Sequence, residues 1–121
     1  MNPADLFRQE TGALQVAPGD FLFREGDKGD KMYVLLEGEM EIVLGDLVLE
    51  TAGPGTLIGE MALIDDSPRT ANAVAKKSCR LAEIDRRRFH FLVQQTPHIA
   101  THVMKTLADR LRHMNTIAAA S

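Results

Sequence analysis

The stretch that decides the fold is "EMEIVLGDLVLE", residues 39–50. Met40, Ile42 and Leu44 occupy every second position, which is the spacing of a strand that turns one face to a core. The pair "GD" at residues 45–46 then separates two apolar runs, and a glycine next to an aspartate favours a two-residue hairpin turn. The stretch therefore predicts two antiparallel strands joined by a tight turn.

Further short apolar runs lie on both sides of this hairpin, between residues 13 and 84. Turn signals rich in glycine, aspartate and proline separate them, namely "PGD", "GDKGD", "GD" and "GPGT". About eight short strands at this spacing are typical of an antiparallel jelly-roll β-barrel, also called a double-stranded β-helix. The runs are "ALQV", "FLF", "MYVLLEG", "EMEIVL", "LVLET", "TLIGE", "NAVA" and "CRLAEI".

Both ends of the chain carry helix signals instead. Residues 2–9, "NPADLFRQ", predict a short N-terminal helix with Leu6 and Phe7 against the body of the domain. After the last strand, Asp85 is placed to cap a helix "RRRFHFLVQQ", and "TP" at residues 96–97 restarts a second helix. The predicted fold class is therefore mainly β, with a jelly-roll barrel flanked by a short N-terminal helix and two C-terminal helices.

The last helix has an apolar stripe that recurs every fourth residue from Ile99 to Leu111. Such a stripe indicates a helix face packed on the rest of the domain. We expect this helix to have about four or five turns and the tail "TIAAAS" to fray. A chain of 121 residues suits one domain, with a helix in residues 1–10, the β-barrel in residues 11–85 and the C-terminal helices in residues 86–115.

Composition limits the classes of function. Hydrophobic residues make up 45% and charged residues 26%, as expected of a folded globular chain. A formal net charge of −3 argues against nucleic-acid binding, which needs a basic face. No apolar run approaches the ~20 residues of a membrane helix, and the N-terminus lacks a signal-peptide pattern. The single cysteine, Cys79, suits a reducing compartment. We expect a cytoplasmic protein that binds neither membranes nor nucleic acid and is a monomer or weak dimer.

The sequence has no motif for catalysis or metal binding. All four histidines lie in the C-terminal helices, whereas a metal-binding jelly roll needs histidines on its strands. There is no HExxH motif and no nucleophile elbow. These patterns argue against a metal-dependent jelly-roll enzyme, so we expect no metal and no catalytic residue. The basic run at residues 86–88 is interpreted as a solvated face with one arginine bridging to the barrel, in preference to an anion site.

The stretch "IGEMALIDDSPRTA", residues 58–71, carries the chemistry. Gly59 allows a sharp turn, and "EMALI" is long enough for one helical turn whose first N–H groups favour an anion. Arg69 follows on a loop, and its planar guanidinium suits bidentate contact with a phosphate. Glu60 would be repelled by a phosphate and should accept hydrogen bonds from hydroxyl groups instead. The pattern indicates a ligand with a phosphate beside a sugar hydroxyl; a direct Glu60–Arg69 ion pair without any ligand is the alternative.

This stretch resembles the phosphate-binding cassette of cyclic nucleotide-binding domains. Upstream, "GDKGDKMYVLLEGEMEIVL" resembles the hairpins that precede the cassette in that family, and the resemblance covers roughly residues 20–111. It implies a sensor domain that is not an enzyme, takes cyclic AMP or cyclic GMP as its ligand and needs no other cofactor. Thr70 does not decide between the two nucleotides, because a hydroxyl at this position is compatible with both. We favour cyclic AMP over cyclic GMP.

The resemblance also implies a role for single residues in a cassette that spans residues 58–73. Arg69 pairs with the exocyclic oxygens of the cyclic phosphate, and Glu60 accepts from the ribose 2′-hydroxyl. The remaining roles fall to backbone amides (Met61, Ala62 and Ala71), to a hydroxyl that reaches the phosphate or the base (Thr70), to the pocket wall (Ile58 and Gly59) and to a lid over the base (Leu111 and Met114).

One departure from the family pattern and one alternative function are also expected to matter. A β-branched pair is common in the family where this chain has Asn72 and Ala73, so we expect a mild change of packing there. An interaction module that has lost nucleotide binding and contacts a partner through its last helix is the alternative. Because no helix-turn-helix or inhibitor segment is recognised, we expect a stand-alone binding protein or an excised module. Its output would be movement of the C-terminal helix, read by a downstream protein or a fused effector domain.

Overall fold

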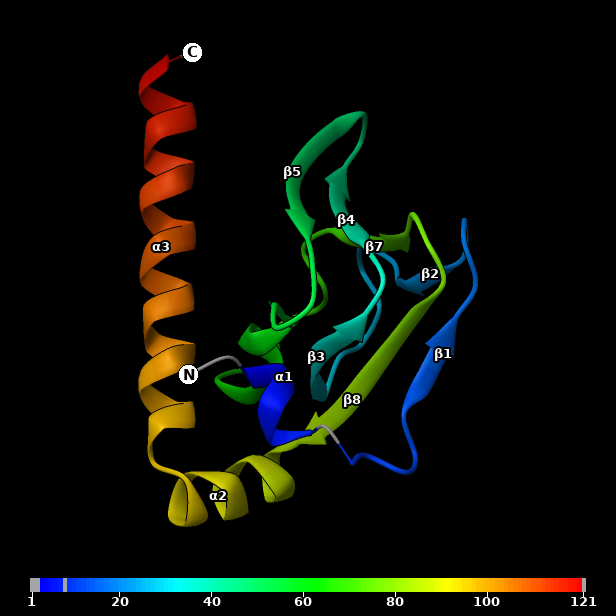
Figure 1. The fold of residues 1–121 in the computed structure, drawn as a ribbon. Coiled ribbons are helices and arrows are strands. Elements are labelled where there is room, and N and C mark those ends of the chain that lie inside the picture. The colour runs from blue at the N-terminus through cyan, green and yellow to red at the C-terminus, as the bar shows by residue number, and fades with distance from the viewer. Residues whose placement is uncertain (1–2, 8, 121) are drawn as a thin grey trace.

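Two four-stranded antiparallel sheets form the body of the molecule, and helices lie along one side of it (Figure 1). A computed structural model describes residues 3–7 and 9–120. The strand order is β1-β8-β3-β6 in one sheet and β2-β7-β4-β5 in the other. The elements are α1 (Pro3–Leu6), β1 (Leu14–Val16), β2 (Phe21–Phe23), β3 (Lys31–Glu37), β4 (Met40–Leu44), β5 (Leu47–Ala52), β6 (Leu57–Ile58), the 3-10 turn η1 (Glu60–Leu63), β7 (Asn72–Ala75), β8 (Cys79–Asp85), α2 (Arg86–Gln95) and α3 (His98–Ala120).

The predicted fold class is confirmed. Each of the apolar runs seen in the sequence coincides with one strand to within a few residues. The strands β4 and β5 pair across the two-residue loop at 45–46, with Leu44 opposite Leu47. Strands distant in sequence also pair, since β8 lies between β1 and β3 and β7 lies between β2 and β4. Such long connections between antiparallel strands are typical of Greek-key and jelly-roll folds.

The core has two parts, one on each face of the sheet that contains β3. Alternate residues along a strand point to opposite faces, so Leu35 of β3 packs between the sheets while Met32 and Val34 pack under the helices. The part between the sheets consists of Val16, Leu35, Met40, Ala52, Ile58, Ala73, Ala75, Cys79 and Leu81. The part under the helices consists of Phe7, Met32, Val34, Leu57, Ala82, Ile84 and Val103.

The terminal helices pack on this second part of the core. Phe7, directly after α1, is buried, and Leu6 packs beside it, as predicted. Residues 1–2 and 8 of the expected N-terminal helix lie outside the described residues. At the start of α2, Oδ1 of Asp85 accepts a hydrogen bond from the backbone N–H of Arg88 at 2.7 Å. The predicted N-cap is therefore confirmed.

The last helix, α3, is longer than expected. Its 23 residues make about six turns, and the alanines of "TIAAAS", which have the highest helix propensity, continue the helix where fraying was expected. Ile99 and Val103 are buried, but Leu111 is 62% and Met114 is 60% exposed. The apolar stripe therefore packs on the sandwich only in its first half, and the C-terminal half of α3 stands apart from the strands beside it (Figure 1).

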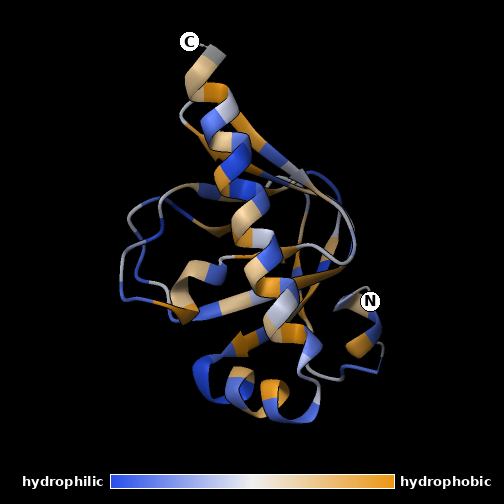
Figure 2. Cartoon of the chain, turned by 90° about the vertical axis from the view of Figure 1, so that its left-hand side faces the viewer, coloured by the Kyte–Doolittle hydropathy of each residue, from blue (hydrophilic) through white to orange (hydrophobic). Residues whose placement is uncertain are grey.

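Hydrophobic and hydrophilic residues alternate along most of α3, whereas its last turn is hydrophobic (Figure 2). On the exposed half of the helix, Leu111 and Met114 stand among polar residues, and Ile117 begins the hydrophobic last turn. Among the described residues, no helix is both long enough and apolar enough to cross a membrane.

Candidate functional site

The cassette forms a sharp corner between β6 and β7. β6 ends at Ile58, Gly59 follows with a left-handed backbone (φ 76°), and η1 makes a single turn, as predicted. A Cβ atom on Gly59 would lie 2.5 Å from Nη1 of Arg69. This position therefore requires glycine twice over, for its backbone conformation and for the close approach of the arginine.

The Arg69 side chain lies in the interior, with only 9% of the residue exposed. Its Nη1 donates to the backbone carbonyl of Gly59 at 3.2 Å, and its Nη2 donates to that of Lys31 at 2.8 Å. The guanidinium carbon stands 4.2 Å from the centre of the Phe23 ring, within the range of a cation–π contact. Carbonyl groups and an aromatic face thus orient the guanidinium without neutralising its charge.

A second glycine-rich segment, "GDKGD" at residues 26–30, holds Arg69 from the other side. The backbone N–H of Arg69 donates to Asp27 O at 2.8 Å, and Gly26 N donates to Arg69 O at 2.8 Å. A Cβ atom on Gly29 would clash with the guanidinium. From the sequence this segment was expected to be a turn and part of the hairpins that resemble the family, and neither expectation indicated its contact with Arg69.

The charge of Arg69 is not matched by a carboxylate. Among the described residues, no ion pair includes Arg69. Its Nε is buried without a hydrogen-bond partner in the described part of the chain. Because buried charges and buried donors are normally paired, the environment of Arg69 is suited to an anion that accepts from the guanidinium.

Glu60, the other charged residue of the cassette, is 4% exposed. Its Oε2 accepts a hydrogen bond from Nη1 of Arg110, which belongs to α3. Glu60 thus pairs with Arg110 while Arg69 binds backbone carbonyls. The alternative in which Glu60 and Arg69 neutralise each other is therefore wrong.

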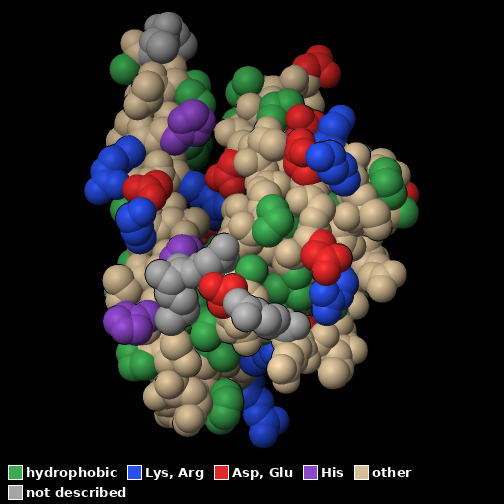
Figure 3. Space-filling model, in the orientation of Figure 1, with side chains coloured by type: hydrophobic (Ala, Val, Ile, Leu, Met, Phe, Trp, Pro, Cys, Tyr) green, Lys and Arg blue, Asp and Glu red, His purple; other side chains and the backbone are tan. Residues whose placement is uncertain are grey.

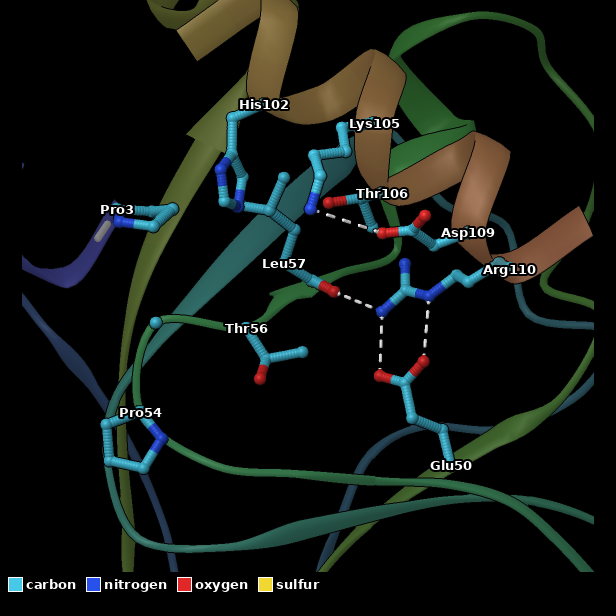
Figure 4. A pocket seen from close by; sticks show the side chains of 11 residues that line it. Pro3, Glu50, Pro54, Thr56, Leu57, His102, Lys105, Thr106, Asp109 and Arg110 are labelled. Carbon is cyan, nitrogen blue, oxygen red and sulfur yellow. Dashed lines mark hydrogen bonds and ion pairs between the residues drawn. The ribbon is translucent and has the colours of Figure 1, made fainter. Parts of the chain in front are cut away.

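Arg110 links three parts of the fold. Its Nε and Nη2 form a bidentate pair with Glu50 of β5, both at 2.9 Å, and Nη2 also donates to Leu57 O at 2.6 Å (Figure 4). Burial opposes the charge of Arg110, but the contacts with Glu50 and Glu60 outweigh it and raise the pKa of the guanidinium above its ordinary value. Sequence reasoning missed Arg110 and Glu50, because residues 60 positions apart carry no local signal of contact.

A cavity of about 430 Å³ opens beside this cluster, between α3 and the loop from β5 to β6. His102, Lys105 and Arg110 line it from α3, and Pro54 and Thr56 line it from the loop (Figure 4). Acidic and basic side chains meet in the furrow between α3 and the sandwich (Figure 3). Arg110 therefore belongs both to the wall of this cavity and to the contact with Glu60.

The other expected site residues divide by exposure. Ile58, Ala62 and Ala71 are buried, whereas Met61 and Thr70 are exposed. The backbone N–H of Ala62 donates to Gly59 O at 3.2 Å, so this amide is already used within the turn. The lid candidates Leu111 and Met114 lie on the exposed half of α3, and their role over a base stays a prediction.

Two arginines of the basic run bridge to other elements, where one was expected. Arg86 donates to Ala62 O at 3.2 Å and to Asp66 Oδ1 at 2.7 Å, and so fastens the C-terminal side of η1 to α2. Arg88 forms a bidentate pair with Glu10, at 2.8 and 2.7 Å. No group of three or more metal-ligand side chains was found within residues 3–7 and 9–120.

The departure from the family pattern at Asn72 and Ala73 has a structural counterpart. Oδ1 of Asn72 accepts a hydrogen bond from the backbone N–H of Glu25 at 2.7 Å, which ties the start of β7 to the segment after β2. Ala73 is fully buried between the sheets. A polar link and a small core residue therefore occupy the place where a β-branched pair is common.

These features agree with comparison to known proteins. Residues 13–96 match the model of the cyclic nucleotide-binding domain. The chain belongs to this family, whose domains bind a regulatory ligand and generally do not catalyse reactions.

Three relatives illustrate the similarity. The cAMP-dependent protein kinase regulatory subunit of Eremothecium gossypii is 40% identical over 61% of this chain and 16% of its own length. A CRP-like cAMP-activated global transcriptional regulator of Mycobacterium tuberculosis is 30% identical over 84% of this chain and 50% of its own length. A structure solved in work on a cyclic-GMP-dependent signalling pathway in bacterial phytopathogenesis has a TM-score of 0.71 and 33% identity, and the match covers 82% of each chain. The chain thus spans half or less of the two curated relatives.

Proposed function

We propose that this chain senses a cyclic nucleotide, with Arg69 on the exocyclic oxygens of the cyclic phosphate and Glu60 on the ribose 2′-hydroxyl. The observation that carries the proposal is the environment of Arg69, which is buried, oriented by two carbonyl groups and without a carboxylate partner in the described chain. A phosphate oxygen would supply the acceptor that Nε lacks and the negative charge that the carbonyls do not.

The separate partners of Glu60 and Arg69 support this division of roles. A carboxylate next to the phosphate would repel it, and Glu60 is held instead by Arg110. Arg110 donates to one oxygen of that carboxylate, Oε2. A carboxylate has about four lone-pair sites, so Glu60 can accept from a sugar hydroxyl as well. Residues Ile58, Gly59, Met61, Thr70 and Ala71 would complete the wall and the backbone contacts, and Ala62, whose amide donates to Gly59 O, would contribute to the wall.

Cyclic AMP is the ligand that we favour over cyclic GMP. The kinase subunit and the transcriptional regulator that resemble this chain are both named for cyclic AMP, while the structure at 33% identity comes from work on a cyclic-GMP-dependent pathway. Thr70 is exposed, and a hydroxyl at this position is compatible with either base. The choice therefore rests on the relatives more than on a residue of this chain.

Movement of α3 is the output that we propose. Arg110 joins Glu60 to α3, and a ligand hydroxyl on Glu60 changes the free energy of that contact. A ligand shifts the position of a helix only by its differential interaction with the two positions, and the Arg110–Glu60 pair supplies such a difference. The signal would pass from α3 to a downstream protein or a fused effector domain, in a cytoplasmic setting. That nucleic acid is not a partner stays a prediction, since one relative is a transcriptional regulator.

Calorimetric titration tests the proposal. The purified chain, stripped of carried-over nucleotide, is titrated with cyclic AMP and then with cyclic GMP. We expect binding in the micromolar range or tighter, stronger for cyclic AMP. Saturating ligand should also stabilise the fold, by about 2.7 kcal/mol at a hundredfold excess over Kd. No heat and no shift of the melting curve with either nucleotide would instead favour an interaction module that has lost binding.

A further inference from the structure

Glu50 lies on β5, outside the cassette, yet it makes the most extensive contact of Arg110. Two of the three guanidinium nitrogens, Nε and Nη2, are directed at its carboxylate at 2.9 Å. The third nitrogen, Nη1, donates to Glu60. The pairing with Glu50, together with the bond from Nη2 to Leu57 O, therefore limits the donors of Arg110 that are directed at Glu60.

We propose that Glu50 is a positioning residue for the ligand site, because it holds Arg110 in an orientation that engages one oxygen of Glu60 and leaves that carboxylate able to accept a ligand hydroxyl. The inference rests on the proposed function and deepens it. Glu50 would act only through Arg110, since both oxygens of its carboxylate accept from the guanidinium (Figure 4).

Removal of the Glu50 charge would release the edge of the Arg110 guanidinium formed by Nε and Nη2, which can bind both oxygens of a carboxylate. Glu60 is the nearest other acid of this cluster, and its side chain is only 5% exposed, against 30% for Glu50. A bidentate arginine–carboxylate pair is stronger than a single hydrogen bond. Arg110 would then direct two donors at the Glu60 carboxylate. These donors would compete with the ligand's 2′-hydroxyl for the oxygens of Glu60.

The test compares a ligand that has the hydroxyl with one that lacks it. In Glu50→Gln, we expect the affinity for cyclic AMP to fall roughly tenfold, as for loss of one hydrogen bond to a charged group. The affinity for 2′-deoxy cyclic AMP should stay within about twofold of the wild type, because this ligand makes no bond to Glu60. In an Arg110→Met background, Glu50→Gln should have no further effect on either ligand.

Glu41→Gln is the matched control. Glu41 lies on the neighbouring strand β4, its side chain is 24% exposed, and its Oε1 is 3.6 Å from Nζ of Lys76. The Glu41→Gln variant should bind both ligands with the affinity of the wild type. Glu50→Asp keeps the charge with a shorter reach, and a smaller loss for cyclic AMP is expected; it also serves if Glu50→Gln folds poorly by its melting curve.

Each outcome has one interpretation. Equal loss of both ligands in Glu50→Gln would mean that Glu50 acts on general stability, and no loss of cyclic AMP would mean that it does not position Arg110. Either result overturns the inference while the proposed function stands. A wild-type chain that binds neither cyclic AMP nor 2′-deoxy cyclic AMP would overturn the proposed function itself.

Discussion

At the scale of single residues, the candidate site depends on a buried arginine that few groups hold in place. Arg69 is oriented by the carbonyls of Gly59 and Lys31 and by the Phe23 ring. None of these groups carries a negative charge. Hydrogen bonds and a ring contact therefore orient the guanidinium, and its fixed fork of donors suits it to a bidentate contact.

Substitution of Arg69 should weaken nucleotide binding severely. Loss of one partner of a buried charge pair costs about 3–5 kcal/mol, so Arg69→Ala should lose roughly two to four decades of affinity by calorimetry. Arg69→Lys should also bind weakly, since an ammonium cannot form the bidentate contact. Arg87→Ala, an exposed arginine of α2, is the control. Arg69→Ala that binds like the wild type would exclude Arg69 from the site.

Gly59 should be replaceable only at the expense of both stability and binding. In Gly59→Ala, a Cβ atom would add strain at φ 76° and would displace Nη1 of Arg69. Gly45 is the control, because its φ is 61° but nothing lies within 4 Å of a Cβ placed there. The free energy of unfolding of both Gly59→Ala and Gly45→Ala should fall by about 1–2 kcal/mol because of the left-handed backbone. Only Gly59→Ala should lose affinity in titrations; equal affinity in the two variants would contradict the contact.

At the scale of elements, side chains near the N-terminus and at the start of α2 hold the ends of the fold together. Asp85 caps α2, and Arg88 of the same turn pairs with Glu10 and donates to Glu83 O at 2.8 Å. The hydrogen bonds from Arg88 lower the pKa of Glu10 below its ordinary value of 4.5. This pair fastens the segment after α1 to the beginning of α2.

The Glu10–Arg88 pair should give the fold an acid-sensitive contribution. Because the pKa of Glu10 is lower in the folded chain than in the unfolded chain, the contribution is complete above about pH 4.5 and disappears as the pH falls through the lower, folded value. Urea unfolding from pH 7 to pH 3 should show Glu10→Gln less stable than the wild type at neutral pH and similar to it in acid. Glu37→Gln, at a side chain 68% exposed, should differ little at any pH. A difference that persists unchanged in acid would contradict this account.

At the scale of the whole molecule, local patterns were enough for the strands and much of the cassette. Period-two alternation and glycine turns located β1 to β8, and the cassette motif located Glu60 and Arg69. The environment of these residues depends on contacts between distant segments. Arg110 meets Glu50 across 60 positions, and Arg69 meets Lys31 across 38. Neither contact has a sequence period, so only the folded chain reveals them.

The extent of α3 was the main error at this scale, and its reason is physical. The apolar stripe indicates a helix face that packs on the rest of the domain, but packing needs an opposite surface. That surface ends near Leu107, which is partly buried, whereas Leu111 is exposed. The alanine-rich sequence beyond this point continues the helix through its high helix propensity, without packing against the sandwich. Apolar periodicity alone does not distinguish such an exposed helix from a packed one.

The length of α3 beyond Arg110 has a mechanical consequence. The helix continues from this residue to Ala120, and at 1.5 Å per residue it forms a stiff lever arm of about 15 Å. A tilt of about 10° with its pivot at Arg110 would carry the tip through about 2.6 Å over such an arm. A change in the single hydrogen bond between Arg110 and Glu60 would be too small to reshape the sandwich. The length of the helix would nevertheless amplify it into a displacement of the tip that a neighbouring surface can detect.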